Sequence, residues 1–101
     1  MAENDMATTN AATESRAIIT VLGGDRPGIV AAVAGALSER NANILDISQT
    51  ILQGTFTMTM LVDLGPADFS DLKACLDELS ATLGVQIMMQ REEVFRYMYR
   101  L

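Results

Sequence analysis

The stretch Gly23-Gly-Asp-Arg-Pro-Gly28 joins an apolar, strand-like run at 17–22 to an Ala- and Val-rich, helix-like run at 29–37. Its first two glycines allow a sharp turn after the strand. Pro27 suits the first turn of a helix, because its φ angle is already helical and no N–H is needed there. The residue before a proline avoids the α region, so Arg26 is predicted to be the last residue before the helix.

The start of this helix is also a candidate ligand site. Its first N–H groups have no partner within the helix and form a positive dipole end. Gly28 places no side chain in front of them, and Asp25 can cap them through its carboxylate. Two interpretations remain open: a cradle for a carboxylate or another small anion, and a tight turn that binds nothing.

The composition is typical of a single globular domain in a reducing compartment. The chain has 101 residues, half of them hydrophobic, which allows one domain with its own core. The single cysteine, Cys75, cannot form an internal disulfide, which favours the cytoplasm. No run reaches 18 apolar residues, and the N-terminus lacks the pattern of a signal peptide. We therefore expect a cytoplasmic protein that does not enter the membrane.

Several classes of function are disfavoured by the residue types. The net charge of −6 argues against nucleic-acid binding, which needs a basic surface. The chain has no histidine, and a lone cysteine does not make a zinc site. Cys75 lies in a leucine-rich helical stretch with no histidine to activate it, so we interpret it as an idle thiol. The sequence therefore predicts no enzyme, no cofactor and no metal.

Residue patterns predict four strands and two main helices. The strands are expected at 16–22, 43–52, 55–63 and 85–90, with a bulge near Asp46 and a turn at Gln53-Gly54. The helices are expected at 27–40 and 69–83, the second capped by Asp68 and ended by Gly84. Residues 1–15 are predicted to be a disordered tail. Residues 16–92 are predicted to be the folded domain, and residues 93–101 a short C-terminal helix or extension. Its apolar stripe includes Val94, Phe95, Met98 and Leu101.

The element order β-α-β-β-α-β predicts an α+β protein with a ferredoxin-like fold. With right-handed crossovers, the strands form one four-stranded antiparallel sheet in the order 4-1-3-2, with both helices on one face. An RNA-binding member of this fold would carry aromatic residues on its first and third strands. Here one face of the third strand presents Thr55, Thr57 and Thr59, which argues against that class.

Two segments of the chain resemble the ACT domain, a family of regulatory modules that sense small molecules, most often amino acids. They are Val21-Leu-Gly-Gly-Asp-Arg-Pro-Gly-Ile-Val30 and Leu37-Ser-Glu-Arg-Asn-Ala-Asn-Ile-Leu-Asp-Ile-Ser48. The sequence is particularly similar to short, stand-alone bacterial ACT proteins over residues 16–92. The resemblance implies a non-enzymatic regulatory homodimer that holds an amino acid or similar effector between the first loop of one subunit and the second strand of its partner.

The resemblance also implies which residues contact the effector. Asp25, Gly28 and Asn43 match ligand-contact positions of the family. With their neighbours, the predicted site consists of Asp25, Arg26, Gly28, Ile29, Asn43 and Ile44. Effector-binding members often have Asn where this chain has Asp25, whose carboxylate would repel that of an amino acid. An alternative function therefore stays open: a dimerisation or protein-interaction module that binds no effector.

The second strand, 43–52, predicts a homodimer from its own residues. It is an edge of the sheet, yet it has no proline, no lysine and only one charge, Asp46. Monomeric proteins protect an edge with those devices, because its unpaired N–H and C=O groups recruit another chain. Pairing across a two-fold axis would give one eight-stranded sheet. The alternative contact is the open sheet face, with Ile18, Leu22 and Met88.

Overall fold

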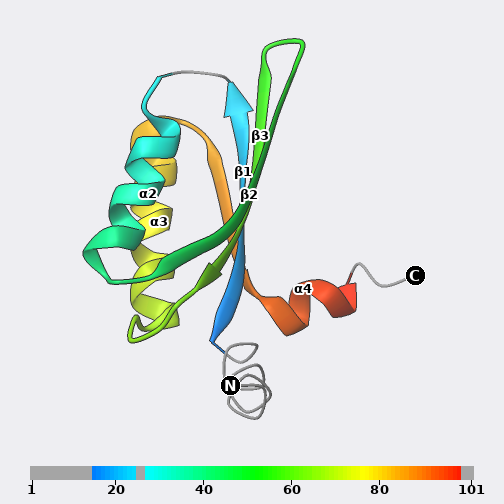
Figure 1. The fold of residues 1–101 in the computed structure, drawn as a ribbon. Coiled ribbons are helices and arrows are strands. Elements are labelled where there is room, and N and C mark those ends of the chain that lie inside the picture. Colours follow the sequence, from blue (N-terminus) through cyan, green and yellow to red (C-terminus); the bar gives the residue numbers. More distant parts are fainter. Residues whose placement is uncertain (1–14, 25–26, 99–101) are drawn as a thin grey trace.

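The computed structural model describes residues 15–24 and 27–98, and Figure 1 shows a single sheet with α2 and α3 on the same face. The elements are β1 (Arg16–Gly24), α2 (Ile29–Glu39), β2 (Asn43–Leu52), β3 (Thr55–Asp63), α3 (Phe69–Leu83), β4 (Gln86–Arg91) and α4 (Glu92–Met98). Adjacent strands are antiparallel in the order β2-β3-β1-β4, which is the predicted order 4-1-3-2 read from the opposite edge. The chain therefore has the predicted ferredoxin-like arrangement, followed by α4.

The core lies between the sheet and the two helices, and β3 builds its centre. Every second residue of this strand is buried: Phe56, Met58, Met60 and Val62. The helices contribute their own buried residues, which include Val33 and Leu37 of α2 and Leu72 and Leu76 of α3. The alternation along β3 thus sends one set of side chains to the helices and leaves the threonines on the other face.

The β2–β3 hairpin contains the irregularities that the sequence predicts. The pairing of the two strands shifts register between Ile44 and Asp46, so Leu45 is the extra residue of a bulge. Gln53 and Gly54 both have positive φ angles, which two-residue hairpin turns require. The predicted bulge and the predicted turn are both confirmed.

The start of α2 differs from the prediction. Gly28 is the N-cap, with a φ angle of 90°, and Ile29 is the first helical residue. The prediction that Pro27 opens the helix is therefore wrong. A right-handed helix cannot include the left-handed backbone at Gly28, which glycine adopts without strain. Arg26, predicted as the last residue before the helix, lies outside the described residues.

Gly23 and Gly24 also differ from the prediction, because they belong to β1 and pair with Phe56 and Thr55 instead of forming the turn. A Cβ atom at Gly23 would lie 2.7 Å from Val85 Cγ1 and 3.2 Å from Val85 Cα. The missing side chain therefore lets the segment between α3 and β4 pack against the end of β1. Local sequence patterns could not reveal this contact, because Val85 is distant in the chain.

Replacing Gly23 with alanine is therefore expected to destabilise the protein by about 1–2 kcal/mol, because the new methyl group overpacks against Val85. Gly24→Ala is the matched control, since no atom lies within 4 Å of the Cβ that it would add. Urea denaturation of the two variants measures the difference. Equal stability of both variants would show that Val85 moves aside without cost.

An ion-pair cluster, and not the predicted apolar stripe alone, holds α4 against the sheet. Glu92, the first residue of α4, is only 1% exposed. Its carboxylate accepts two hydrogen bonds from Arg16 of β1, at 2.8 and 2.9 Å, and two from Arg96, at 2.8 and 2.6 Å. Val94 of the predicted stripe is exposed, and Leu101 lies outside the described residues.

The first described residue, Ser15, is bonded to the rest of the fold. Its carbonyl accepts a hydrogen bond from the N–H of Leu64 at 2.8 Å, and its hydroxyl donates to Asp63 at 3.0 Å. The remainder of the predicted tail, 1–14, lies outside the described residues.

A chain shortened to begin at Ser15 is expected to melt at the same temperature as the full chain. Residues 1–14 have no periodic apolar pattern with which to dock. Differential scanning calorimetry of the two chains checks this expectation. A fall of several degrees on shortening would instead show that the tail packs on the domain.

Candidate functional site

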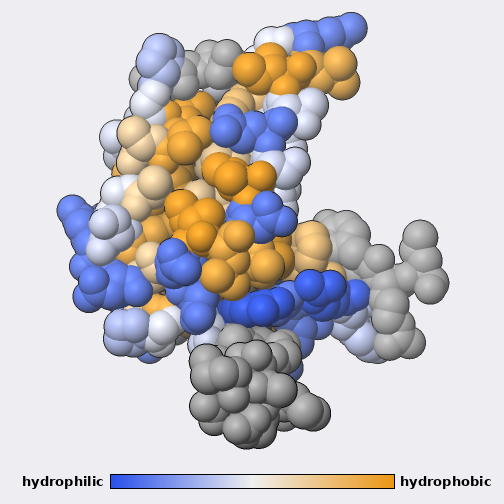
Figure 2. Space-filling view, viewed as in Figure 1, coloured by the Kyte–Doolittle hydropathy of each residue, from blue (hydrophilic) through white to orange (hydrophobic). Residues whose placement is uncertain are grey.

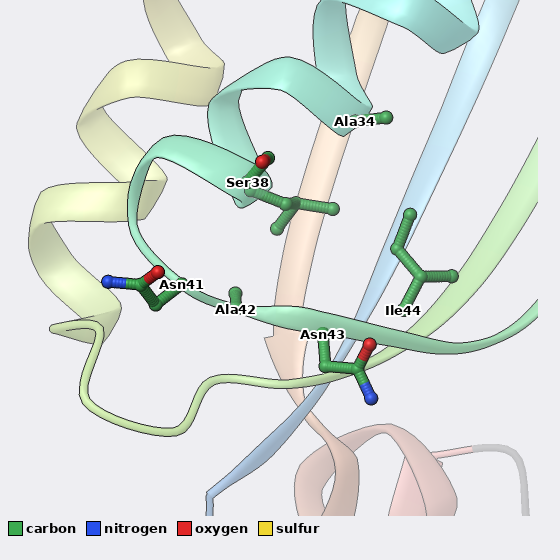
Figure 3. Close-up of a pocket in the computed structure, with 7 residues that line it drawn as sticks. Ala34, Ser38, Asn41, Ala42, Asn43 and Ile44 are labelled. Carbon is green, nitrogen blue, oxygen red and sulfur yellow. The ribbon is translucent and has the colours of Figure 1, made fainter.

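A cleft of about 500 Å³ lies between the second half of α2 and the start of β2 (Figure 3). Its lining residues are Ala34, Leu37, Ser38, Asn41, Ala42, Asn43 and Ile44. In Figure 3, Ile44 points toward Ala34 across the cleft, whereas the carboxamides of Asn41 and Asn43 point away from it. The cleft therefore has apolar walls and polar groups near its mouth.

None of the seven lining residues has an ionisable side chain. Arg40 interrupts the lining segment, but its guanidinium donates to Asp71 of α3 at 2.9 Å and to the carbonyl of Ala36 at 3.2 Å. The lining thus offers one hydroxyl group and two carboxamides. A charged ligand would therefore need oppositely charged groups from outside these seven lining residues.

The end of α2 fixes the position of the cleft residues. The N–H groups of Arg40 and Ala42 both donate to the carbonyl of Leu37, at 3.1 and 3.0 Å. Asn41 takes a left-handed conformation, with a φ angle of 60°, and stops the helix. The chain then enters β2 directly, so the first residues of that strand lie beside the helix that precedes it.

The structure divides the six predicted site residues into separate groups. Asn43 and Ile44 belong to the cleft. Gly28 and Ile29 lie at the other end of α2, where Ile29 is buried in the core and a Cβ at Gly28 would meet no atom within 4 Å. The remaining two, Asp25 and Arg26, lie outside the described residues.

The length of α2 keeps the groups apart. The helix has 11 residues, which at about 1.5 Å per residue separates its ends by roughly 16 Å. Asn43 therefore lies near Ala34 and Ser38 of its own chain, and far from Gly28. Sequence reasoning missed these two helix residues. Their spacing of four, which places them on one face of α2, was the available signal.

The edge strand β2 exposes an apolar surface next to the cleft. Nine of its ten residues are exposed. Four of them are large and apolar: Leu45, Ile47, Ile51 and Leu52, with exposed fractions of 43, 38, 57 and 71%. These four make up half of the exposed large apolar side chains among the described residues. Figure 2 shows apolar side chains that extend across this side of the molecule toward the hairpin tip.

The sheet face that points away from α2 and α3 also exposes large apolar side chains. Leu22 and Met88 are exposed there, Leu52 points to the same face at the hairpin tip, and Ile18 is buried. Figure 1 shows α4 on this side of the sheet, near the start of β1. Both candidate contact surfaces therefore carry exposed apolar side chains, and Leu45, Ile47 and Ile51 belong to the β2 edge.

Residues 15–24 and 27–98 contain neither a metal-binding cluster nor a membrane-spanning helix. No group of three or more His, Cys, Asp or Glu side chains in these ranges is arranged to hold a metal ion. No helix within the same ranges is both long enough and apolar enough to cross a membrane.

The ferredoxin-like fold, the cleft beside α2 and the apolar edge together describe a small binding module. Residues 15–90 match the family model for the ACT domain, and the chain belongs to the ACT domain family. The predicted family is thereby confirmed. ACT domains are regulatory modules that bind small molecules.

Individual relatives support the same assignment. A UPF0237 protein from Methanocaldococcus jannaschii is 51% identical over 89 residues, which cover 86% of this chain and 99% of that protein. An ACT domain protein from Streptococcus pneumoniae is 43% identical, with a TM-score of 0.70, over 79% of this chain and 92% of that one. The ligand-free regulatory subunit of aspartate kinase from Thermus thermophilus is 26% identical, with a TM-score of 0.62, over 78% of this chain and 52% of that one.

Proposed function

We propose that this chain is a non-enzymatic regulatory protein that forms a homodimer and binds an amino acid or a similar small molecule between its subunits. The observation that supports this most directly is the separation of the predicted site residues to opposite ends of α2. The lining of the cleft with Asn43 and Ile44 has no charged side chain, and at the helix start a Cβ on Gly28 would meet no atom within 4 Å. Neither half is a complete site for a charged ligand.

Pairing of two β2 edges joins the two halves. A two-fold axis perpendicular to the sheet sets the strands antiparallel, so the Asn43 end of one strand meets the Leu52 end of the other. In Figure 1, the hairpin tip and the start of α2 lie at one end of the molecule, and the end of α2 and the start of β2, whose residues line the cleft, lie at the other end. The start of the partner's α2 therefore comes beside the cleft.

The joined site suits the two charges of an amino acid. The start of the partner's α2 presents a positive dipole end to the ligand's carboxylate. The hydroxyl of Ser38, and the carboxamide oxygen of Asn43 once its side chain turns toward the cleft, accept hydrogen bonds from the ligand's ammonium group. The apolar walls at Ala34 and Ile44 leave room for a side chain. The asymmetry between the two halves thus orients the ligand.

Thermal-shift measurements with the common amino acids test this function. At a hundredfold excess over its Kd, a ligand stabilises the folded state by about 2.7 kcal/mol, and for a domain of this size the melting temperature rises by roughly 10 °C or more. Asn43→Ala is expected to reduce the shift and to leave the ligand-free protein nearly as stable, because Asn43 is exposed. If no amino acid shifts a protein that light scattering finds dimeric, the alternative function without an effector is supported instead.

A further inference from the structure

The bulge in β2 limits the register in which two copies of this strand can pair. Leu45 is the extra residue of the bulge and interrupts regular pairing. Regular pairing with β3 runs from Asp46 to Leu52, a segment whose midpoint is Gln49. Two identical segments that pair across a two-fold axis make the most contacts when the axis passes through their midpoint. The intersubunit pairing therefore centres on Gln49.

The same register brings apolar side chains together. Ile47 and Ile51 pair with Met60 and Phe56 of β3, which are buried on the helix side of the sheet. Directly paired residues point to the same face, so both isoleucines point to the helix side as well. With the axis at Gln49, Ile47 of each subunit lies opposite Ile51 of the other.

Neighbouring registers lose these contacts. With the axis at Ser48, Ile47 lies opposite Gln49, and Ile51 lies opposite the bulge, where regular pairing fails. With the axis at Thr50, Ile51 lies opposite Gln49, and Ile47 lies opposite the hairpin turn. Of the three axes, the one at Gln49 gives both isoleucines an apolar partner. The two-fold axis repeats the Ile47–Ile51 pair, so it occurs twice in the dimer.

We propose that Ile51 of each subunit completes the ligand chamber of its partner, an inference that rests on the dimer and the binding site proposed above. The partner's Ile51 stands opposite Ile47 and diagonally next to Ile44, which lines the cleft on the β2 side. Ile51 is 57% exposed in the single chain. It adds an apolar side chain beside Ile44 at the edge of the cleft, so the side chain at position 51 sets the size of the ligand that fits.

Disulfide trapping tests the register without any ligand. In a Cys75→Ala background, a chain with Ile47→Cys is refolded together with a chain with Ile51→Cys and oxidised mildly. Directly opposed residues have Cβ atoms about 4.5–5.5 Å apart, within a small shift of disulfide geometry. The mixture is expected to give a covalent heterodimer, and either chain alone little product. Ile47→Cys that links readily to its own copy, or a dimeric mixture that forms no link, would overturn the register.

Two size variants test the chamber itself, with the same panel of amino acids in thermal-shift measurements. Ile51→Ala is expected to shift the preference toward larger side chains, and Ile51→Phe toward smaller ones. Leu52→Ala is the control, because Leu52 pairs with Thr55 and points to the other face. Unchanged preference in both dimeric Ile51 variants overturns the assignment. If no amino acid stabilises the wild type, both the proposed function and the proposed ligand chamber are wrong. Disulfide trapping then still shows whether Ile51 lies opposite the partner's Ile47.

Discussion

One of two proline substitutions, Ser48→Pro or Gln49→Pro, is expected to convert the proposed dimer into a folded monomer. Successive N–H groups along a strand point to opposite edges, so one of these two residues donates toward β3 and the other toward the open edge of β2. Proline at the open-edge position removes a donor of the intersubunit ladder and leaves the pairing with β3 intact. The other substitution is expected to lower the stability of the subunit as well.

Light scattering after size exclusion measures the mass of each variant, and circular dichroism checks that it is folded. Ser48→Ala and Gln49→Ala are the matched controls, and both should remain dimeric because they keep the backbone N–H. If both proline variants are folded and still dimeric, the β2 edge is not the interface. The open sheet face with Leu22 and Met88 would then take its place.

Glu92→Ala is expected to lower the unfolding free energy by about 2–4 kcal/mol, because it leaves the Arg16 guanidinium without its main partner. The loss is smaller than for a fully enclosed pair, since the side chains of Arg16 and Arg96 are 24% and 66% exposed. For a domain of this size, the melting temperature should fall by roughly 10–20 °C. Glu93→Ala is the control, because Glu93 is exposed on the same helix. A loss below about 1 kcal/mol would mean that the cluster acts as a surface ion pair.

The same carboxylate predicts a pH dependence. Hydrogen bonds from Arg16, and less strongly from Arg96, hold the pKa of Glu92 below its ordinary value against the opposing effect of burial. This contribution to stability is fully present above the pKa of an unfolded glutamate, about 4.3, and is lost as the pH falls through the lower folded pKa. Between about pH 6 and pH 3, the unfolding free energy should fall more steeply in the wild type than in Glu92→Gln. Parallel curves would assign the acid sensitivity to other carboxyl groups.

Local patterns in the chain were enough to predict the elements and their order. The alternation along β3 identified its buried face. The carboxylate of Asp68 accepts a hydrogen bond from the N–H of Asp71 at 2.9 Å, and Gly84 ends α3 with a φ angle of 71°. These features depend on residues within a few positions of one another, so the sequence contains their whole cause. The edge position of β2 followed from the order of the elements.

Contacts between segments that are distant in the sequence could be identified only from the tertiary structure. Gly23 faces Val85, and Arg16 pairs with Glu92. The hydrophobic periodicity of the sequence does not indicate either contact. Periodicity reports which face of an element is apolar, but it does not report which distant residue fills the space against that face. The candidate site shows the same division. The sequence motif joins Gly28 and Asn43 in one site, whereas α2, roughly 16 Å long, separates them within one chain. In the proposed site, they therefore come from different subunits.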